Sequence, residues 1–172
     1  MIRHATLPAF TALAVLLALA GGCDPVQGDA VSALPDEVAG VGPGPLHRAG
    51  QPCTLCHDGS IGSPGEFAVA GTVFLQPGSG VGVKGALVSM TDATLTTRVA
   101  KTNEAGNFFL KPDEWTPVFP LRNIVVTSGA TTVTMYSEVG RDGSCGKCHI
   151  EPAGPASPGH ITLQSDDGGG PL

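Results

Sequence analysis

Charge, aromatic side chains and long apolar runs are all scarce in this sequence of 172 residues. Only 14% of the residues are charged, and the chain has one Trp and one Tyr. It has no Ser/His/Asp set, phosphate-binding loop or paired-carboxylate signature to which we would assign catalysis. Lys and Arg number 9 against 15 Asp and Glu, which argues against nucleic acid or an anionic membrane surface as a partner. Simple solubility is the alternative use of these charges.

Glycine and proline are abundant, with 25 and 15 residues, a mixture typical of short strands joined by turns. Between residues 66 and 139 apolar residues alternate, and a period of two indicates half-buried strands. About seven such runs predict an all-β fold, an antiparallel β-sandwich with irregular, partly helical flanks. Trp115 and Tyr136 are expected in its core or on a haem-packing surface. The runs span 67–75, 86–90, 95–101, 108–110, 118–121, 124–127 and 131–138.

Residues 103–107, Asn-Glu-Ala-Gly-Asn, separate two of these runs and are predicted to form a hairpin turn with Gly106 at positive φ. Three stretches around this turn read Ala-Gly-Thr-Val (70–73), Gly-Val-Lys-Gly-Ala-Leu-Val (82–88) and Thr-Asn-Glu-Ala-Gly-Asn-Phe (102–108). Together they resemble the carboxypeptidase regulatory-like (transthyretin-like) β-sandwich family. The resemblance implies a structural or adhesive module without catalytic residues.

The first 22 residues have the pattern of an export signal, in which Arg3 precedes an uncharged apolar run from Leu7 to Ala20. This run is short for a membrane span. The sequence Leu-Ala-Gly-Gly-Cys that follows resembles a bacterial lipobox, apart from Ala20 where leucine is usual. The resemblance implies that Cys23 is lipidated and becomes the mature N-terminus. An ordinary cleavable signal with Cys23 merely nearby is the alternative.

The other four cysteines form two Cys-x-x-Cys pairs, each followed at once by histidine. Cys-x-x-Cys-His is the attachment signature of a c-type haem, because its thiols bond the porphyrin vinyls and the adjacent imidazole ligates the iron. Two cysteines three positions apart fall on about one helical turn and present both sulfurs to one edge of the porphyrin. Two haem c groups are therefore predicted. Their motifs are Cys53-Thr54-Leu55-Cys56-His57 and Cys145-Gly146-Lys147-Cys148-His149, with His57 and His149 as proximal iron ligands.

Two other uses of these cysteines remain as alternatives. Cys53, Cys56, Cys145 and Cys148 could form one tetrahedral zinc site, but a histidine follows both pairs and zinc–thiolate sites are uncommon in exported proteins. Each pair could instead form a disulfide, although the βαβ context of thioredoxin-like motifs is absent.

Two histidines outside the motifs, His47 and His160, are candidate distal ligands. His47 precedes the first motif and His160 follows the second, so each could reach the far face of a haem through a Pro/Gly-containing loop. Their number and placement predict bis-histidine ligation of both irons, without deciding which histidine serves which haem. A solvated loop histidine is the alternative. Met90 and Met135 are competing axial ligands, but both fall in predicted strands and are expected in the core or on the sheet surface.

The predicted organisation follows from these motifs. We expect an exported, lipid-anchored dihaem c-type cytochrome of the bacterial cell envelope, at the periplasmic or outer surface, that transfers single electrons and turns over no substrate of its own. Its acidic balance favours a basic redox partner. The alternatives are a haem protein with an open iron site, acting as a peroxidase or small-molecule sensor, and a surface scaffold or adhesion module with subsidiary haems. The predicted segments are a signal peptide (1–22), a flexible tether (23–46), a first haem-binding segment (47–65), the sandwich (66–139), a second haem-binding segment (140–162) and a disordered tail (163–172).

Overall fold

A computed structural model describes residues 25–60 and 63–164 of the chain. The chain divides into two compact units, Met1–Leu34 and Pro35–Leu172, which we treat separately. In the part of the chain that is described, no helix is long and apolar enough to cross a membrane. The predicted signal peptide and the lipidation site at Cys23 lie outside the described residues.

The predicted tether, residues 23–46, contains regular structure. Its N-terminal part includes the eight-residue helix α2 (Pro25–Ser32), which belongs to the smaller unit. Its C-terminal part belongs to the larger unit, where the carbonyl oxygen of Pro45 accepts hydrogen bonds from Asn103 Nδ2 at 2.6 Å and Asn107 Nδ2 at 3.2 Å. Asparagine side chains far along the chain therefore supply donors to this loop, and the flexible tether stays a prediction.

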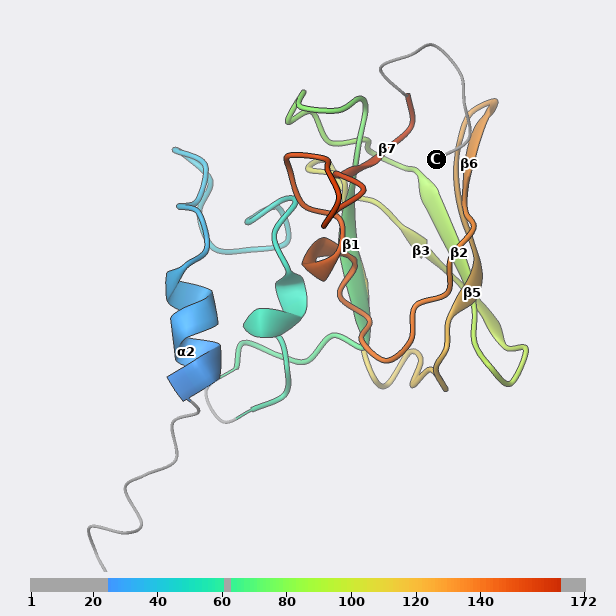
Figure 1. The fold of residues 1–172 in the computed structure, drawn as a ribbon, viewed down its shortest axis with the longest axis horizontal. Coiled ribbons are helices and arrows are strands. Elements are labelled where there is room, and N and C mark those ends of the chain that lie inside the picture. The colour runs from blue at the N-terminus through green and yellow to red at the C-terminus, as the bar shows by residue number, and fades with distance from the viewer. Residues whose placement is uncertain (1–24, 61–62, 165–172) are drawn as a thin grey trace, which may run out of the picture. The chain divides into compact units, whose positions relative to one another are not determined.

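The larger unit is an all-β sandwich of two sheets, which confirms the predicted fold class (Figure 1). In the first sheet, β1 (Val69–Phe74) pairs antiparallel with β4 (Asn107–Leu110) and parallel with β7 (Ile161–Thr162). The second sheet has the order β3-β2-β5-β6 with antiparallel neighbours. Its strands are β2 (Leu87–Thr91), β3 (Thr97–Lys101), β5 (Arg122–Ser128) and β6 (Thr131–Met135).

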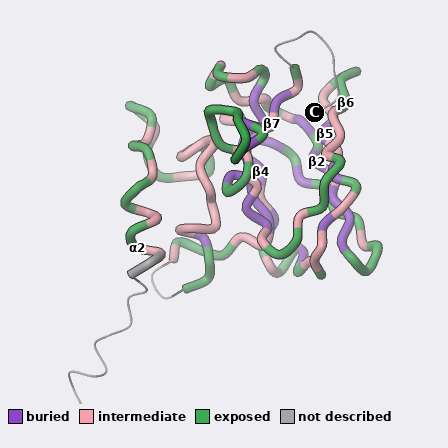
Figure 2. Tube along the Cα trace, viewed as in Figure 1, coloured by how far each residue is buried: buried purple, intermediate pink, exposed green. Residues whose placement is uncertain are grey.

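Buried apolar side chains from both sheets form one core, and the buried stretches in Figure 2 follow the strands. Met90 is 1% exposed, and Trp115 is buried in the same cluster. Met90 is therefore a core residue, as expected, whereas Met135 is half-buried and packs against the core. Tyr136 is 73% exposed, so it lies outside the core, and its packing against a haem stays a prediction. The core consists of Val69, Val73, Ala86, Val88, Met90, Ala100, Phe108, Leu110, Trp115, Leu121, Ile124 and Val126.

Two predicted strand assignments change. Residues 118–121 form no strand: Pro120 has no backbone N–H to give to a ladder, and Leu121 makes only an isolated bridge to Val139. The seventh strand is instead β7, which lies in the predicted second haem-binding segment. Leu163 and Gln164, predicted to begin the disordered tail, continue this edge by donating backbone hydrogen bonds to Phe74 O and Leu75 O.

The 103–107 turn has the predicted local conformation but not the predicted role. Gly106 has a φ of +78°, and a Cβ there would come within 2.2 Å of Val73 O. Asn103 Oδ1 accepts hydrogen bonds from Ala105 N and Asn107 N, which closes the turn. However, the strands on either side, β3 and β4, belong to different sheets. The turn therefore carries the chain from one sheet to the other and forms no hairpin.

The second haem-binding segment is an insertion within one edge of the first sheet. Ser144 bridges Ala70 in parallel, and Ile161 pairs with Val73 in parallel further along β1. Since β4 occupies the other edge of β1, both pieces lie along the same edge. The chain leaves this edge after Ser144, forms the second motif, and returns at Ile161.

Candidate haem-attachment site

The two Cys-x-x-Cys-His motifs have the same local structure. The first cysteine of each motif begins a short 3₁₀ helix, η1 (Cys53–Leu55) and η2 (Cys145–Lys147). In each motif the carbonyl oxygen of that cysteine accepts hydrogen bonds from the second cysteine's N–H and the histidine's N–H, at 3.2 and 3.0 Å in the first and 3.1 and 2.9 Å in the second. Both thiols therefore lie on one turn, and the histidine follows directly, as haem attachment requires.

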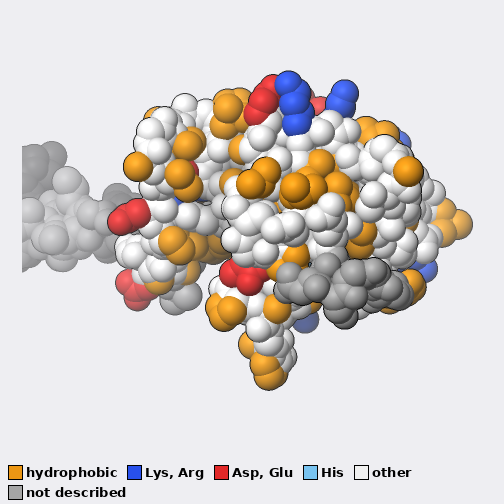
Figure 3. All heavy atoms as spheres, turned by 90° about the horizontal axis from the view of Figure 1, so that it is seen from above, with side chains coloured by type: hydrophobic (Ala, Val, Ile, Leu, Met, Phe, Trp, Pro, Cys, Tyr) orange, Lys and Arg blue, Asp and Glu red, His pale blue; other side chains and the backbone are white. Residues whose placement is uncertain are grey.

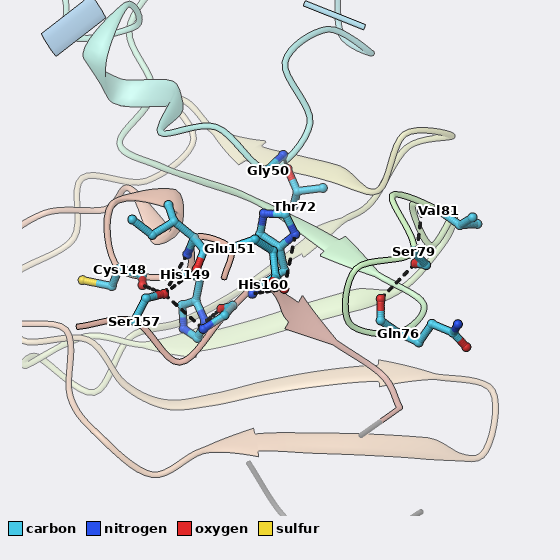
Figure 4. Close-up of polar contacts among 12 residues, drawn as sticks. Gly50, Thr72, Gln76, Ser79, Val81, Cys148, His149, Glu151, Ser157 and His160 are labelled. Carbon is cyan, nitrogen blue, oxygen red and sulfur yellow. Dashed lines mark hydrogen bonds and ion pairs between the residues drawn. The ribbon is translucent and has the colours of Figure 1, made fainter. Parts of the chain in front are cut away.

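Each motif histidine is held by a backbone carbonyl. His57 Nδ1 lies 3.0 Å from Gly65 O. His149, which Figure 4 shows, has its Nδ1 3.0 Å from Gly159 O. A carbonyl oxygen only accepts, so Nδ1 carries the proton and Nε2 keeps a free lone pair. A hydrogen bond of this kind fixes the tautomer and ring orientation of metal-ligating histidines.

A repeated tripeptide positions these carbonyls. Ser63-Pro64-Gly65 follows the first motif, and Ser157-Pro158-Gly159 follows the second. The hydroxyl of Ser63 donates to Cys56 O at 2.8 Å, and that of Ser157 lies at the same distance from Cys148 O. The serine thus ties the loop back to the second cysteine, while the glycine two positions later supplies the carbonyl. The sequence analysis missed these residues, although Ser-Pro-Gly recurring after each motif was a visible signal.

The two motifs, far apart in the sequence, lie side by side next to β1 (Figure 1). A Cβ on Gly146 would come within 2.7 Å of Gln51 O, so the second turn packs closely against the residues before Cys53. Asp142 joins the two: it accepts a hydrogen bond from Thr54 Oγ1 at 3.4 Å and forms an ion pair with Lys147.

The four motif cysteines are free thiols, of which Cys148 is exposed and the other three are half-buried. Burial raises the pKa of the Cys53 thiol to about 11 and that of Cys145 to about 12, so both are protonated at neutral pH. Within residues 25–60 and 63–164, no three His, Cys, Asp or Glu side chains are grouped to hold a metal ion. The thiols are therefore not gathered into the tetrahedral cluster that the zinc alternative requires.

His57 lies in a column of aromatic rings. Its ring centroid is 4.1 Å from that of Phe67, and Phe67 is 4.5 Å from Phe109, with planes 14° and 12° apart. His57 is only 8% exposed. His149 is half-buried and its neighbour Cys148 is exposed, so the second motif is the more open to solvent. Burial still lowers the pKa of His149, against the raising effect of its hydrogen bond to Gly159.

His47 lies close to the first motif, in a loop held by the first sheet. Its ring centroid is 6.0 Å from that of His57, with planes 20° apart. Asn107 Nδ2 donates to His47 O at 3.0 Å, which fixes the backbone. The N–H of Gly44 donates to His47 Nδ1 at 3.0 Å, so in the neutral ring Nε2 carries the proton. Ligation by His47 through Nε2 thus requires this bond to be given up.

His160, in the second haem-binding segment, packs against the first. Its ring lies on Phe74, with centroids 4.4 Å apart, and a Cβ on Gly50 would come within 2.9 Å of its Nε2. Its Nδ1 is 3.9 Å from Glu151 Oε1, and Figure 4 shows it between Glu151 and the Gly50–Thr72 pair. Burial lowers the pKa of His160, although Glu151 raises it.

The comparisons with family models, curated proteins and solved structures found no match to this chain. The candidate site therefore rests on its own chemistry. Each motif offers two thiols on one turn and an adjacent imidazole with a free Nε2, a donor set that fits a covalently attached haem.

Proposed function

We propose that this chain is an exported, lipid-anchored electron-transfer protein carrying two haem c groups. The observation that supports it most is the matched anchoring of His57 Nδ1 by Gly65 and of His149 Nδ1 by Gly159, each at 3.0 Å. A cysteine pair with another purpose gives no reason for the following imidazole to be oriented twice in the same way.

The residues have distinct roles in this proposal. Cys53 and Cys56 would hold one haem and Cys145 and Cys148 the other through thioether bonds. His57 and His149 present Nε2 as proximal ligands while the loop carbonyls keep their rings from turning. When bound, each haem supplies a one-electron ferric/ferrous couple, whose potential depends on its axial ligands and burial.

Two features favour electron transfer over a structural role for the haems. The second motif packs through Gly146 against Gln51, just before the first motif, so their cofactors would share one small region of the protein. The chain has a net charge of −6, which would steer a basic redox partner. The face in Figure 3 is mostly uncharged, with acidic and basic side chains in a few places.

Intact-mass spectrometry of the mature protein, exported from a host with a haem-attachment system, tests the proposal. We expect a mass with two haems and a lipid, the lipid on Cys23. Cys53→Ala with Cys56→Ala should remove one haem, Cys145→Ala with Cys148→Ala should remove the other, and Ser79→Ala should keep both. A wild-type mass without two haem additions would end the cytochrome proposal. A mass with two haems and no lipid would contradict only the proposed lipid anchor.

A further inference from the structure

The position of His160 relative to His149 limits what it can ligate. Gly159 O holds His149 on its Nδ1 side, and His160 is the next residue. The backbone of His160 therefore starts behind the His149 ring. A sixth ligand of an iron bound to His149 has to approach from the opposite, Nε2 side, so His160 cannot reach that position while the His149–Gly159 hydrogen bond is present.

The ring of His160 is also engaged on three sides. Phe74 stacks on its face at 4.4 Å, and Gly50 packs against its Nε2 edge. Glu151 Oε1 lies 3.9 Å from its Nδ1 and accepts a hydrogen bond from its backbone N–H at 3.3 Å. These contacts join β1, the first haem-binding segment and the second, which is the arrangement of a structural brace.

His47 differs from His160 in each respect. Its ring is 6.0 Å from that of its neighbour His57, and no carbonyl adjacent to His47 in the chain holds the His57 ring from behind. One backbone hydrogen bond, from Gly44 N–H, holds the His47 ring nitrogen. Exchanging that bond for an iron ligand costs little, because Gly44 is only half-buried and its N–H can bond to water instead.

We infer that His160 is a structural brace and that the two haem sites are unequal. His47 closes the first, whereas the Nε2 side of His149 stays open to an external ligand. The ligand class is a small neutral diatomic molecule, such as carbon monoxide or nitric oxide, which donates a lone pair to ferrous iron without a redox step. The greater exposure of Cys148 and His149 gives such a molecule access. The inference rests on the proposed attachment of two haems.

Carbon monoxide titration of the reduced dihaem protein, followed by absorption, tests this asymmetry. We expect one carbon monoxide per chain in the wild type and two in His47→Ala. His160→Phe, which keeps the stacking on Phe74 but removes the ring nitrogens, should still bind one.

Several outcomes would overturn the inference. No binding by the wild type would show that both irons are closed, and a second binding site gained in His160→Phe would make His160 a ligand. Two molecules bound by the wild type would overturn the role of His47. The haem count by intact mass separates these results from failure of the proposed function, since a chain with fewer than two haems overturns both. If His160→Phe does not accumulate, the carbon monoxide stoichiometries of the wild type and His47→Ala still test whether one haem site is open and whether His47 closes the other.

Discussion

The first and second haem-binding segments hold the same five-residue motif in different surroundings. The first covers one face of the sheet β4-β1-β7: Thr72, which alternates with the core residues Val69 and Val73 on β1, accepts a hydrogen bond from Gly50 N at 2.8 Å. The second is a loop inserted along the edge of the same sheet and is held largely by its own serine. Their local geometry is nonetheless the same.

This difference separates what the motif determines from what the fold determines. The turn that presents two thiols and a histidine depends on hydrogen bonds between residues three and four apart, so it forms in either place. Burial depends on the surroundings, and His57 is 8% exposed beneath its loop, whereas His149 is half-buried on an edge. Equal motifs can therefore give haems of unequal access and potential.

The largest loss of stability is expected where the second segment docks against β1. A Cβ on Gly143 would come within 1.9 Å of Ala68 O, a backbone atom that cannot move aside. We expect Gly143→Ala to lower the free energy of unfolding by about 3 kcal/mol, measured by urea unfolding followed by circular dichroism. Gly140→Ala is the matched control, because nothing lies within 4 Å of its Cβ position. Equal stability of the two variants would show that the edge insertion is not closely docked.

A smaller loss of unfolding free energy is expected when Ser63 or Ser157 is replaced, and it should differ between the two. Ser157 Oγ lies within 3.1 Å of Cys148 O, Ile150 O, Ile150 N and Gly159 N. Among the described residues, Ser63 Oγ has two hydrogen-bond partners, Cys56 O and Gly65 O. We expect Ser157→Ala to cost about 2 kcal/mol and Ser63→Ala about 1 kcal/mol of unfolding free energy.

The same urea titration measures both serine variants. Ser79→Ala, which loses a serine from a surface loop outside both motifs, serves as the control. If Ser63→Ala is the more damaging variant, the second loop is held by something other than its serine.

These contrasts also show what the sequence could and could not predict. The sandwich and the motif turns were predictable, because alternation and Cys-x-x-Cys-His spacing are local signals. Strand β7 was not, since its two residues carry no periodicity and pair only through β1. The adjacency of the motifs was not predictable either, because it depends on that long-range parallel pairing.

The candidate ligands divide in the same way. His57 and His149 are specified by their motifs. The roles of His47 and His160 depend on hydrogen bonds to Gly44 and Gly159, which counting histidines cannot supply. A closer comparison of the two flanks would have found the recurring Ser-Pro-Gly, and with it the loop that anchors each histidine.

The smallest expected effect on stability concerns Asp142, a carboxylate that joins the two segments. Asp142 is paired with Lys147 and accepts hydrogen bonds from Ser144 N at 2.9 Å and Thr54 Oγ1 at 3.4 Å. Burial alone would raise the pKa of Asp142, but the hydrogen bond from Lys147 and those from Ser144 and Thr54 lower it below its usual 3.8. The stabilisation is therefore present above that value and is lost as the pH falls through the lowered pKa.

Asp142→Asn should cost only about 0.5 kcal/mol near neutral pH, since both partners of the ion pair are more than a third exposed and water screens them. The unfolding free energies of the variant and the wild type should converge as the pH falls below 3.8, while the exposed Asp113→Asn control should differ little from wild type near neutral pH. A double-mutant cycle with Thr54→Val then measures the coupling between segments. A coupling well above 0.5 kcal/mol, about the value of a surface pair, would mean that the two segments form one cooperative unit. A value near zero would mean that Asp142 stabilises the second segment alone, because its bonds to Ser144 and Lys147 both lie there.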